Sequence, residues 1–79
     1  MEQVQSTDKM CVNLIERDIF IYNVENIDEL SETNAITIDR KNKVVHIINI
    51  QYIRIEENGD MFVTHKYGYF RVRQKTGAR

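Results

Sequence analysis

Apolar and polar residues alternate with a period of two along most of the chain, the pattern of strands with one buried face. In 9–15, Met10, Val12 and Leu14 alternate with more polar positions. After a loop at 16–18, the run 19–24 is β-branched and aromatic, as strands commonly are. These two segments predict an antiparallel hairpin near the N-terminus.

Between residues 35 and 55 the same pattern continues, with one interruption. Residues 35–40 predict a strand, and Lys41-Asn42 predicts a two-residue turn into the next strand, because Asn tolerates positive φ. Near 49–51 the alternation changes phase. Because a one-residue slip moves side chains to the other face of a sheet, this change predicts a bulge or bend that splits the run into two strands.

The last third predicts a hairpin turn followed by two consecutive strands. Asn58-Gly59 is the strongest short hairpin signal in the chain. Strands are expected at 61–65 and 69–73, joined by a turn at 66–68.

The acidic segment 25–34 breaks the alternation and is expected to form one or two helical turns or a loop. Asn26 stands where a helix N-cap is favoured, and Glu29 follows three residues later, as a capping box requires. Ile27 and Leu30 would share one helical face.

Together these elements predict one mainly β domain over residues 1–79. We expect a small antiparallel β-meander or partly open barrel of five to seven strands, with at most one short helix near 26–33. Residues 1–8 and 75–79 are expected to be flexible. A chain this short buries only about 60% of its unfolded surface, so a homodimer or other homo-oligomer is also expected.

The composition gives no signature of catalysis. Cys11 is the only cysteine, so an internal disulfide is excluded, and a buried structural thiol is expected. His46 and His65 lack partners at metal-ligand spacing and are expected to be cross-strand or surface histidines. We therefore expect no enzyme activity, no cofactor and no metal.

The chain is expected to be cytoplasmic. Its first residues are polar, with no signal-peptide pattern, and no apolar run approaches a membrane span. The lone cysteine fits a reducing compartment. The absence of Pro and Trp, with many Ile, Asn, Lys and Glu, is typical of AT-rich bacteria or their phages, so the compartment would be the host cytoplasm if the protein is phage-encoded.

The near-neutral net charge of −1 hides a division along the chain. Up to Asn34 there are eight acids and two bases, whereas from Ala35 there are nine bases and four acids. The basic end contains aromatic residues and predicts a partner-binding surface. Its candidate residues are Lys66, Tyr67, Tyr69, Arg71, Arg73 and Lys75. The alternative is an edge strand protected by charge.

Four acids form a secondary candidate patch: Glu25, Asp28, Glu29 and Glu32. They would form the pole opposite the basic end, docking a basic partner or the basic face of a second copy. The alternative is a solvated acidic loop.

The stretch 35–73 resembles the first half of a LytTR-type DNA-binding domain. The residues that carry the resemblance are Ile48, Ile50, Tyr52, Ile53, Glu56, His65, Gly68, Tyr69 and Val72. It implies a small multi-stranded β fold that inserts loops into DNA grooves to regulate transcription. Two features depart from the family: its second half is absent, and the loop 56–60, where the family contacts DNA, is acidic here.

Three functions follow as hypotheses. The first is a bacterial or phage-encoded regulator or inhibitor that binds a protein through the basic, aromatic surface. The second is a LytTR-like nucleic-acid-binding module, whose binding must weaken with salt. The third is a structural subunit of a phage particle that pairs through its edge strands. The slightly negative net charge favours the first.

Overall fold

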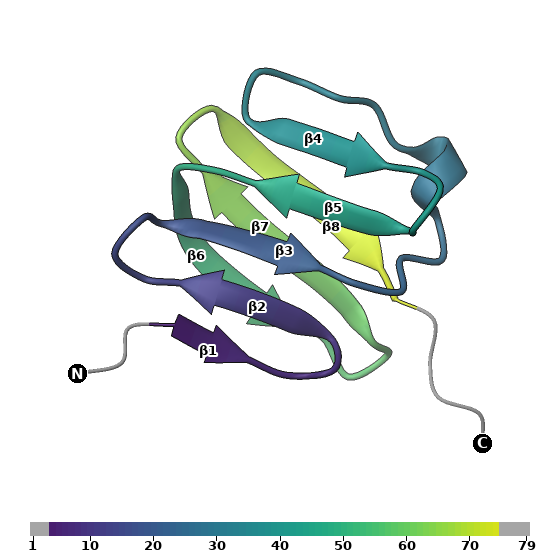
Figure 1. Cartoon of the computed structure of the whole chain (residues 1–79), viewed down its shortest axis with the longest axis horizontal. Coiled ribbons are helices and arrows are strands. Elements are labelled where there is room, and N and C mark those ends of the chain that lie inside the picture. Colours follow the sequence, from purple (N-terminus) through teal and green to yellow (C-terminus); the bar gives the residue numbers. More distant parts are fainter. Residues whose placement is uncertain (1–3, 75–79) are drawn as a thin grey trace.

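The computed structural model describes residues 4–74, which form eight strands and one turn of 3₁₀ helix (Figure 1). The elements are β1 (Val4–Ser6), β2 (Met10–Asn13), β3 (Asp18–Ile21), η1 (Ile27–Glu29), β4 (Ile36–Asp39), β5 (Val44–Ile47), β6 (Ile50–Ile55), β7 (Asp60–His65) and β8 (Gly68–Arg73). The predicted mainly β architecture is confirmed. The structure has eight strands rather than the five to seven expected, because β1 lies within the segment 1–8 that was expected to be flexible.

The strands form two antiparallel sheets that lie one behind the other (Figure 1). The five-stranded sheet has the order β1-β2-β3-β5-β4, and the three-stranded sheet has the order β6-β7-β8. The first sheet is not a simple meander, since β5 lies between β3 and β4. Ile47 of β5 pairs with Ile19 on one side and with Ile36 on the other, and it is completely buried in this internal position.

One hydrophobic core joins the two sheets. Ile19 and Ile47 of the first sheet are completely buried, as is Val63 of the second. Along β7, buried Met61 and Val63 alternate with Phe62 and Thr64, which are only partly buried. The inner face of the three-stranded sheet is therefore apolar, and its alternate residues point away from the core.

The predicted break near 49–51 is confirmed, and it carries the chain from one sheet to the other. Asn49 has a φ of 57°, and the β6–β7 register shifts between Ile50 and Tyr52. The Ile50 N–H donates to the Arg17 carbonyl at 2.9 Å, which secures the crossover against the β2–β3 loop. The hairpin at Asn58-Gly59 is also confirmed, and Gly59 supplies its positive φ of 96°.

Two local predictions were wrong. The capping box does not form: the Asn26 side chain accepts a hydrogen bond from the Arg73 N–H at 3.1 Å instead of capping η1. A long-range contact thus outcompetes the local cap. The β4–β5 turn has four residues, 40–43, because Asp39 pairs with Val44.

The far end of β8 is tied to the first sheet. Gln74 forms an isolated bridge with Val24, and its Nε2 donates to the carbonyls of Lys9 (2.8 Å) and Tyr22 (3.0 Å). The Glu25 N–H donates to the Arg73 carbonyl at 2.7 Å. These bonds fix how β8 is placed beside the first sheet. In the described range, no helix has the length and hydrophobicity needed to cross a membrane.

Candidate protein-binding face

The outward surface of the three-stranded sheet gathers aromatic and arginine side chains from all three strands. Cross-strand register places Tyr52, Thr64 and Tyr69 in one row, and Arg54, Phe62 and Arg71 in the next. Asp60 and Arg73 form a third row. We call this surface the Tyr/Arg face, and its residues are Tyr52, Arg54, Glu56, Asp60, Phe62, Thr64, Tyr69, Arg71 and Arg73.

The aromatic rings of this face are held in different ways. Tyr52 is 62% exposed and Tyr69 is 72% exposed, so both present most of their surface to solvent. Phe62 is partly buried and lies between two guanidinium groups. The Cζ atoms of Arg54 and Arg71 are 5.1 and 5.5 Å from the centre of its ring. Such cation–π contacts hold the arginines over the ring.

Asp60 anchors the arginines from below. Its side chain is only 4% exposed, and its Oδ2 accepts from Arg71 Nε at 2.9 Å and from Arg71 Nη2 at 2.5 Å. Its Oδ1 lies 3.7 Å from Arg73 Nε. The two arginine side chains remain about half exposed. Their outer edges are thus free to contact a partner while their positions are fixed.

Arg54 is also paired within the face. Its Nε lies 2.6 Å from Glu56 Oε2. The face therefore sets three guanidinium groups against two carboxylates, and its positive charge is small.

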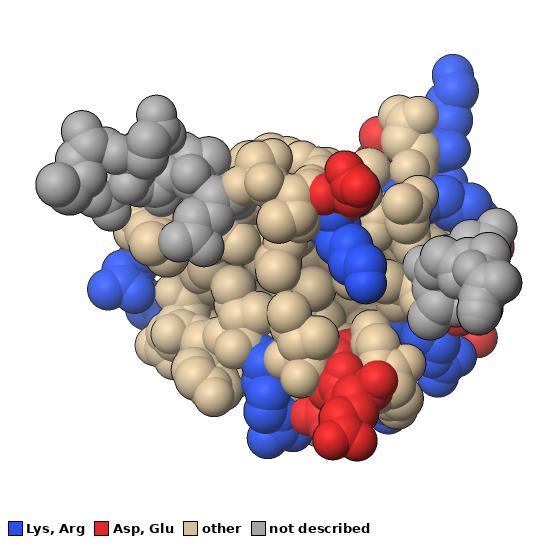
Figure 2. Space-filling view, turned by 90° about the horizontal axis from the view of Figure 1, so that it is seen from below, with Lys and Arg blue, Asp and Glu red and all other residues tan. Residues whose placement is uncertain are grey.

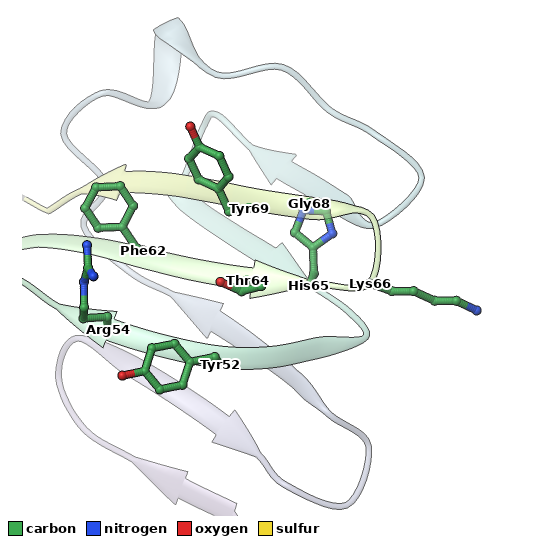
Figure 3. Close-up of a pocket in the computed structure, with 8 residues that line it drawn as sticks. All are labelled: Tyr52, Arg54, Phe62, Thr64, His65, Lys66, Gly68 and Tyr69. Carbon is green, nitrogen blue, oxygen red and sulfur yellow. The ribbon is translucent and has the colours of Figure 1, made fainter.

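A shallow depression of about 680 Å³ lies between the two exposed tyrosines (Figure 3). Thr64 forms its floor, because the small threonine on β7 stands between Tyr52 on β6 and Tyr69 on β8. Arg54 and Phe62 lie toward one end, and Lys66 lies at the other end (Figure 3). An inserted flat or apolar side chain would contact both tyrosine rings.

The structure brings together only part of the site predicted from the sequence. Tyr69, Arg71 and Arg73 lie together on the Tyr/Arg face. Lys66 and Tyr67 lie in the β7–β8 turn, where the Lys66 ammonium is 5.8 Å from the Tyr67 ring centre. Lys75 lies outside the described residues.

Sequence reasoning missed Tyr52, Arg54 and Phe62, which are half of the six aromatic and arginine residues of the face. The signal that could have found them is the Asn58-Gly59 hairpin. With this turn fixed, alternation along β6 and β7 places all three side chains on the face opposite Met61 and Val63.

The acidic segment is not a pole opposite the basic end, contrary to the sequence-based expectation. Glu25 is hydrogen-bonded through its backbone to Arg73, so the segment begins beside the basic strand. Asp28 and Glu29 are exposed in η1. The Glu32 carboxylate, in the loop before β4, accepts from the Ile38 N–H at 3.0 Å. The patch has a structural role at two of its four residues.

The outward face of the five-stranded sheet has a different chemistry. Phe20 stacks on His46 with ring centres 4.0 Å apart, and His46 Nε2 lies 3.1 Å from Asp18 Oδ2. His46 is thus a cross-strand histidine, as predicted. Cys11 is partly exposed rather than buried, which corrects the prediction of a buried thiol. Burial raises the pKa of the neighbouring Tyr22 phenol, and Cys11 adds to the rise.

Within residues 4–74, no group of three His, Cys, Asp or Glu residues is arranged to hold a metal ion. Figure 2 shows that acidic and basic side chains lie interspersed on the side of the molecule seen from below. No family model, curated protein or solved structure matches the chain.

Proposed function

We propose that this protein is a non-catalytic binding module that acts as a regulator or inhibitor by contacting another protein through the Tyr/Arg face. The observation that carries the proposal is the anchoring of Arg71 and Arg73 by buried Asp60. Their orientation is fixed before binding, so less side-chain entropy is lost when a partner docks. Tyr and Arg are also the residues most enriched at the energetic centres of protein interfaces.

The charge of the face supports a protein partner over a nucleic acid. Arg54 is paired with Glu56, and Arg71 and Arg73 share Asp60. A phosphate would have to compete with these carboxylates for the guanidinium groups. A protein partner can contact the exposed tyrosine rings and still leave the ion pairs in place.

The decisive experiment is affinity capture with the immobilised protein from a bacterial lysate treated with nuclease. The test variant is Tyr52→Ser with Tyr69→Ser, which removes the two most exposed rings of the face without touching the core. The matched control is Ile15→Ser, since Ile15 is 70% exposed and lies in the β2–β3 loop. We expect a protein that the wild type and the control retain and the double variant loses. Equal retention by all three would reject the Tyr/Arg face as the binding surface.

A second candidate function is single-stranded nucleic-acid binding. It is favoured by the two exposed tyrosines that flank the depression, with Arg54 and Lys66 at its ends. Nucleobases stack on exposed tyrosine rings, and phosphate groups pair with basic side chains such as those of Arg54 and Lys66. A gel shift with single-stranded DNA and RNA tests this candidate: binding must weaken steeply with salt and disappear in the same tyrosine double variant. No retardation at low salt would eliminate it.

A further inference from the structure

The open edge of β6 is the longest unprotected edge among the described strands. The edges of the five-stranded sheet, β1 and β4, are only three and four residues long. The other edge of the small sheet, β8, carries Arg71 and Arg73 and is tied at its end to residues 24–26. β6 has six residues and, in the described part of the chain, pairs only with β7.

The composition of β6 does little to prevent pairing with another strand. Natural edge strands are usually short or carry unpaired charges that block edge-to-edge association. The one charge on β6 is that of Arg54, and Glu56 already pairs with it. Ile55 is 58% exposed, and Ile53 is only partly buried. The strand therefore offers unpaired backbone groups together with apolar side chains.

From these observations we infer that β6 pairs antiparallel with β6 of a second copy, which joins two three-stranded sheets into one six-stranded sheet. The sequence of the strand specifies the register. If the two-fold axis passes through Ile53, residues 51–55 of both copies pair. Residues directly opposite one another then lie on the same side of the joined sheet.

This register is self-complementary on both sides of the sheet. Arg54 lies opposite Tyr52 of the second copy, and the symmetry repeats that contact. Ile53 lies opposite Ile53 of the second copy, at the edge of the core. A shift of the axis to Arg54 would place two arginines opposite each other, which is unfavourable. A second copy thus fits the edge in one preferred register.

The inference goes beyond the proposed function and does not require it. The dimer places two Tyr/Arg faces side by side on one surface, whether the face binds protein or nucleic acid. Tyr52 and Arg54 belong both to the dimer contact and to the Tyr/Arg face, whereas Ile55 lies on the β6 edge and outside that face. A substitution at Ile55 therefore tests the dimer separately from the proposed partner.

Sedimentation equilibrium of the full chain, from about 1 µM to about 1 mM, tests the association. We expect a reversible monomer–dimer equilibrium. Ile55→Lys introduces a charge twice per dimer and should raise the dissociation constant at least about tenfold. Ile15→Lys, at another exposed isoleucine that lies outside the edge, should leave the dissociation constant unchanged. A wild type that stays monomeric over the whole range, or an Ile55→Lys dimer of undiminished affinity, would overturn the inference.

Disulfide trapping tests the register independently of affinity. In a Cys11→Ser background, one chain carries Tyr52→Cys and another carries Arg54→Cys, both at exposed positions. In the proposed register these residues are directly opposite, about 5 Å apart, within disulfide reach, whereas two copies of either one are diagonal at about 7–8 Å. Covalent dimers should form in the mixture and not in either variant alone. Equal cross-linking of one variant with itself, or none in the mixture, would refute this register.

Discussion

The outward faces of the two sheets differ in how their carboxylates are paired. On the five-stranded sheet, Asp18 pairs with His46, and Phe20 stacks on the histidine ring. On the three-stranded sheet, Asp60 is buried and holds two arginines at once. The first arrangement satisfies each polar group with a neighbour. In the second arrangement, the buried Asp60 carboxylate holds Arg71 and Arg73 in place while both side chains stay about half exposed.

This difference indicates where a partner is expected to bind. On the five-stranded sheet, His46 is stacked against Phe20 and its Nε2 is paired with Asp18, so its polar atom is already engaged. A fixed guanidinium beside an exposed tyrosine leaves both groups available and pre-organised. Substitutions at matched positions of the two faces test that contrast.

The largest effect is expected on binding of the captured partner. Tyr69→Ala should weaken the affinity about 30-fold, or about 2 kcal/mol, because it removes an exposed anchor of the Tyr/Arg face. Phe20→Ala on the opposite face should change the affinity less than about twofold. Isothermal titration calorimetry measures both. Comparable losses from the two substitutions would show that the faces do not differ in the way proposed.

The next effect concerns stability. Asp60→Asn removes the charge that Arg71 and Arg73 share and should lower the free energy of unfolding by about 1.5 kcal/mol, since hydrogen bonds to charged groups are stronger than neutral ones. Asp18→Asn should cost less than about 1 kcal/mol, because its single partner is partly exposed. Urea unfolding of both variants provides the measurement. The contrast fails if Asp18→Asn costs as much as Asp60→Asn.

A smaller loss is expected from the ring between the arginines. Phe62→Leu keeps an apolar side chain but removes two cation–π contacts, and should cost about 1 kcal/mol of stability. It should also loosen Arg54, whose other partner is Glu56. The guanidinium NMR signals of Arg54 and Arg71 report that mobility. If the NMR signals stay unchanged while the free energy of unfolding falls by the expected amount, Phe62 acts through packing and not through the arginines.

The smallest effect is expected for Asp39 of the five-stranded sheet, whose carboxylate accepts hydrogen bonds from the turn that follows it. The Asn42 side chain and N–H donate to Asp39 and lower the pKa of that carboxyl. A lowered folded-state pKa stabilises the fold above the ordinary pKa of aspartate, and this stabilisation is lost as the pH falls through the folded value. Asn42→Ala should raise the pKa of Asp39 toward its ordinary value in an NMR titration. An unmoved titration curve would mean that the side-chain bond is not formed in solution.

Local pattern was enough to predict much of the fold. Alternation located seven of the eight strands, the phase change located the crossover at Asn49, and Asn58-Gly59 located the β6–β7 hairpin. These features depend on backbone conformation and on the alternation of side chains within a few residues. A short stretch of sequence is therefore enough to predict each of them.

Features that depend on distant residues could not be predicted in this way. The Asn26 side chain bonds to Arg73 instead of capping η1, and β5 inserts between β3 and β4. The β1 strand is short and polar, so only its pairing with β2 identifies it. In each case the deciding contact joins residues that the local pattern does not connect.

The candidate site divides along the same line. That Tyr69, Arg71 and Arg73 share one face follows from the sequence alone, because side chains along a strand alternate with a period of two. That Tyr52, Arg54 and Phe62 join them depends on the register of three strands, which is a property of the folded chain. The position of Asp60 beneath the arginines is also such a property, because burial depends on what neighbouring strands place above a residue. The sequence fixes local direction, whereas packing and strand order decide which side chains meet.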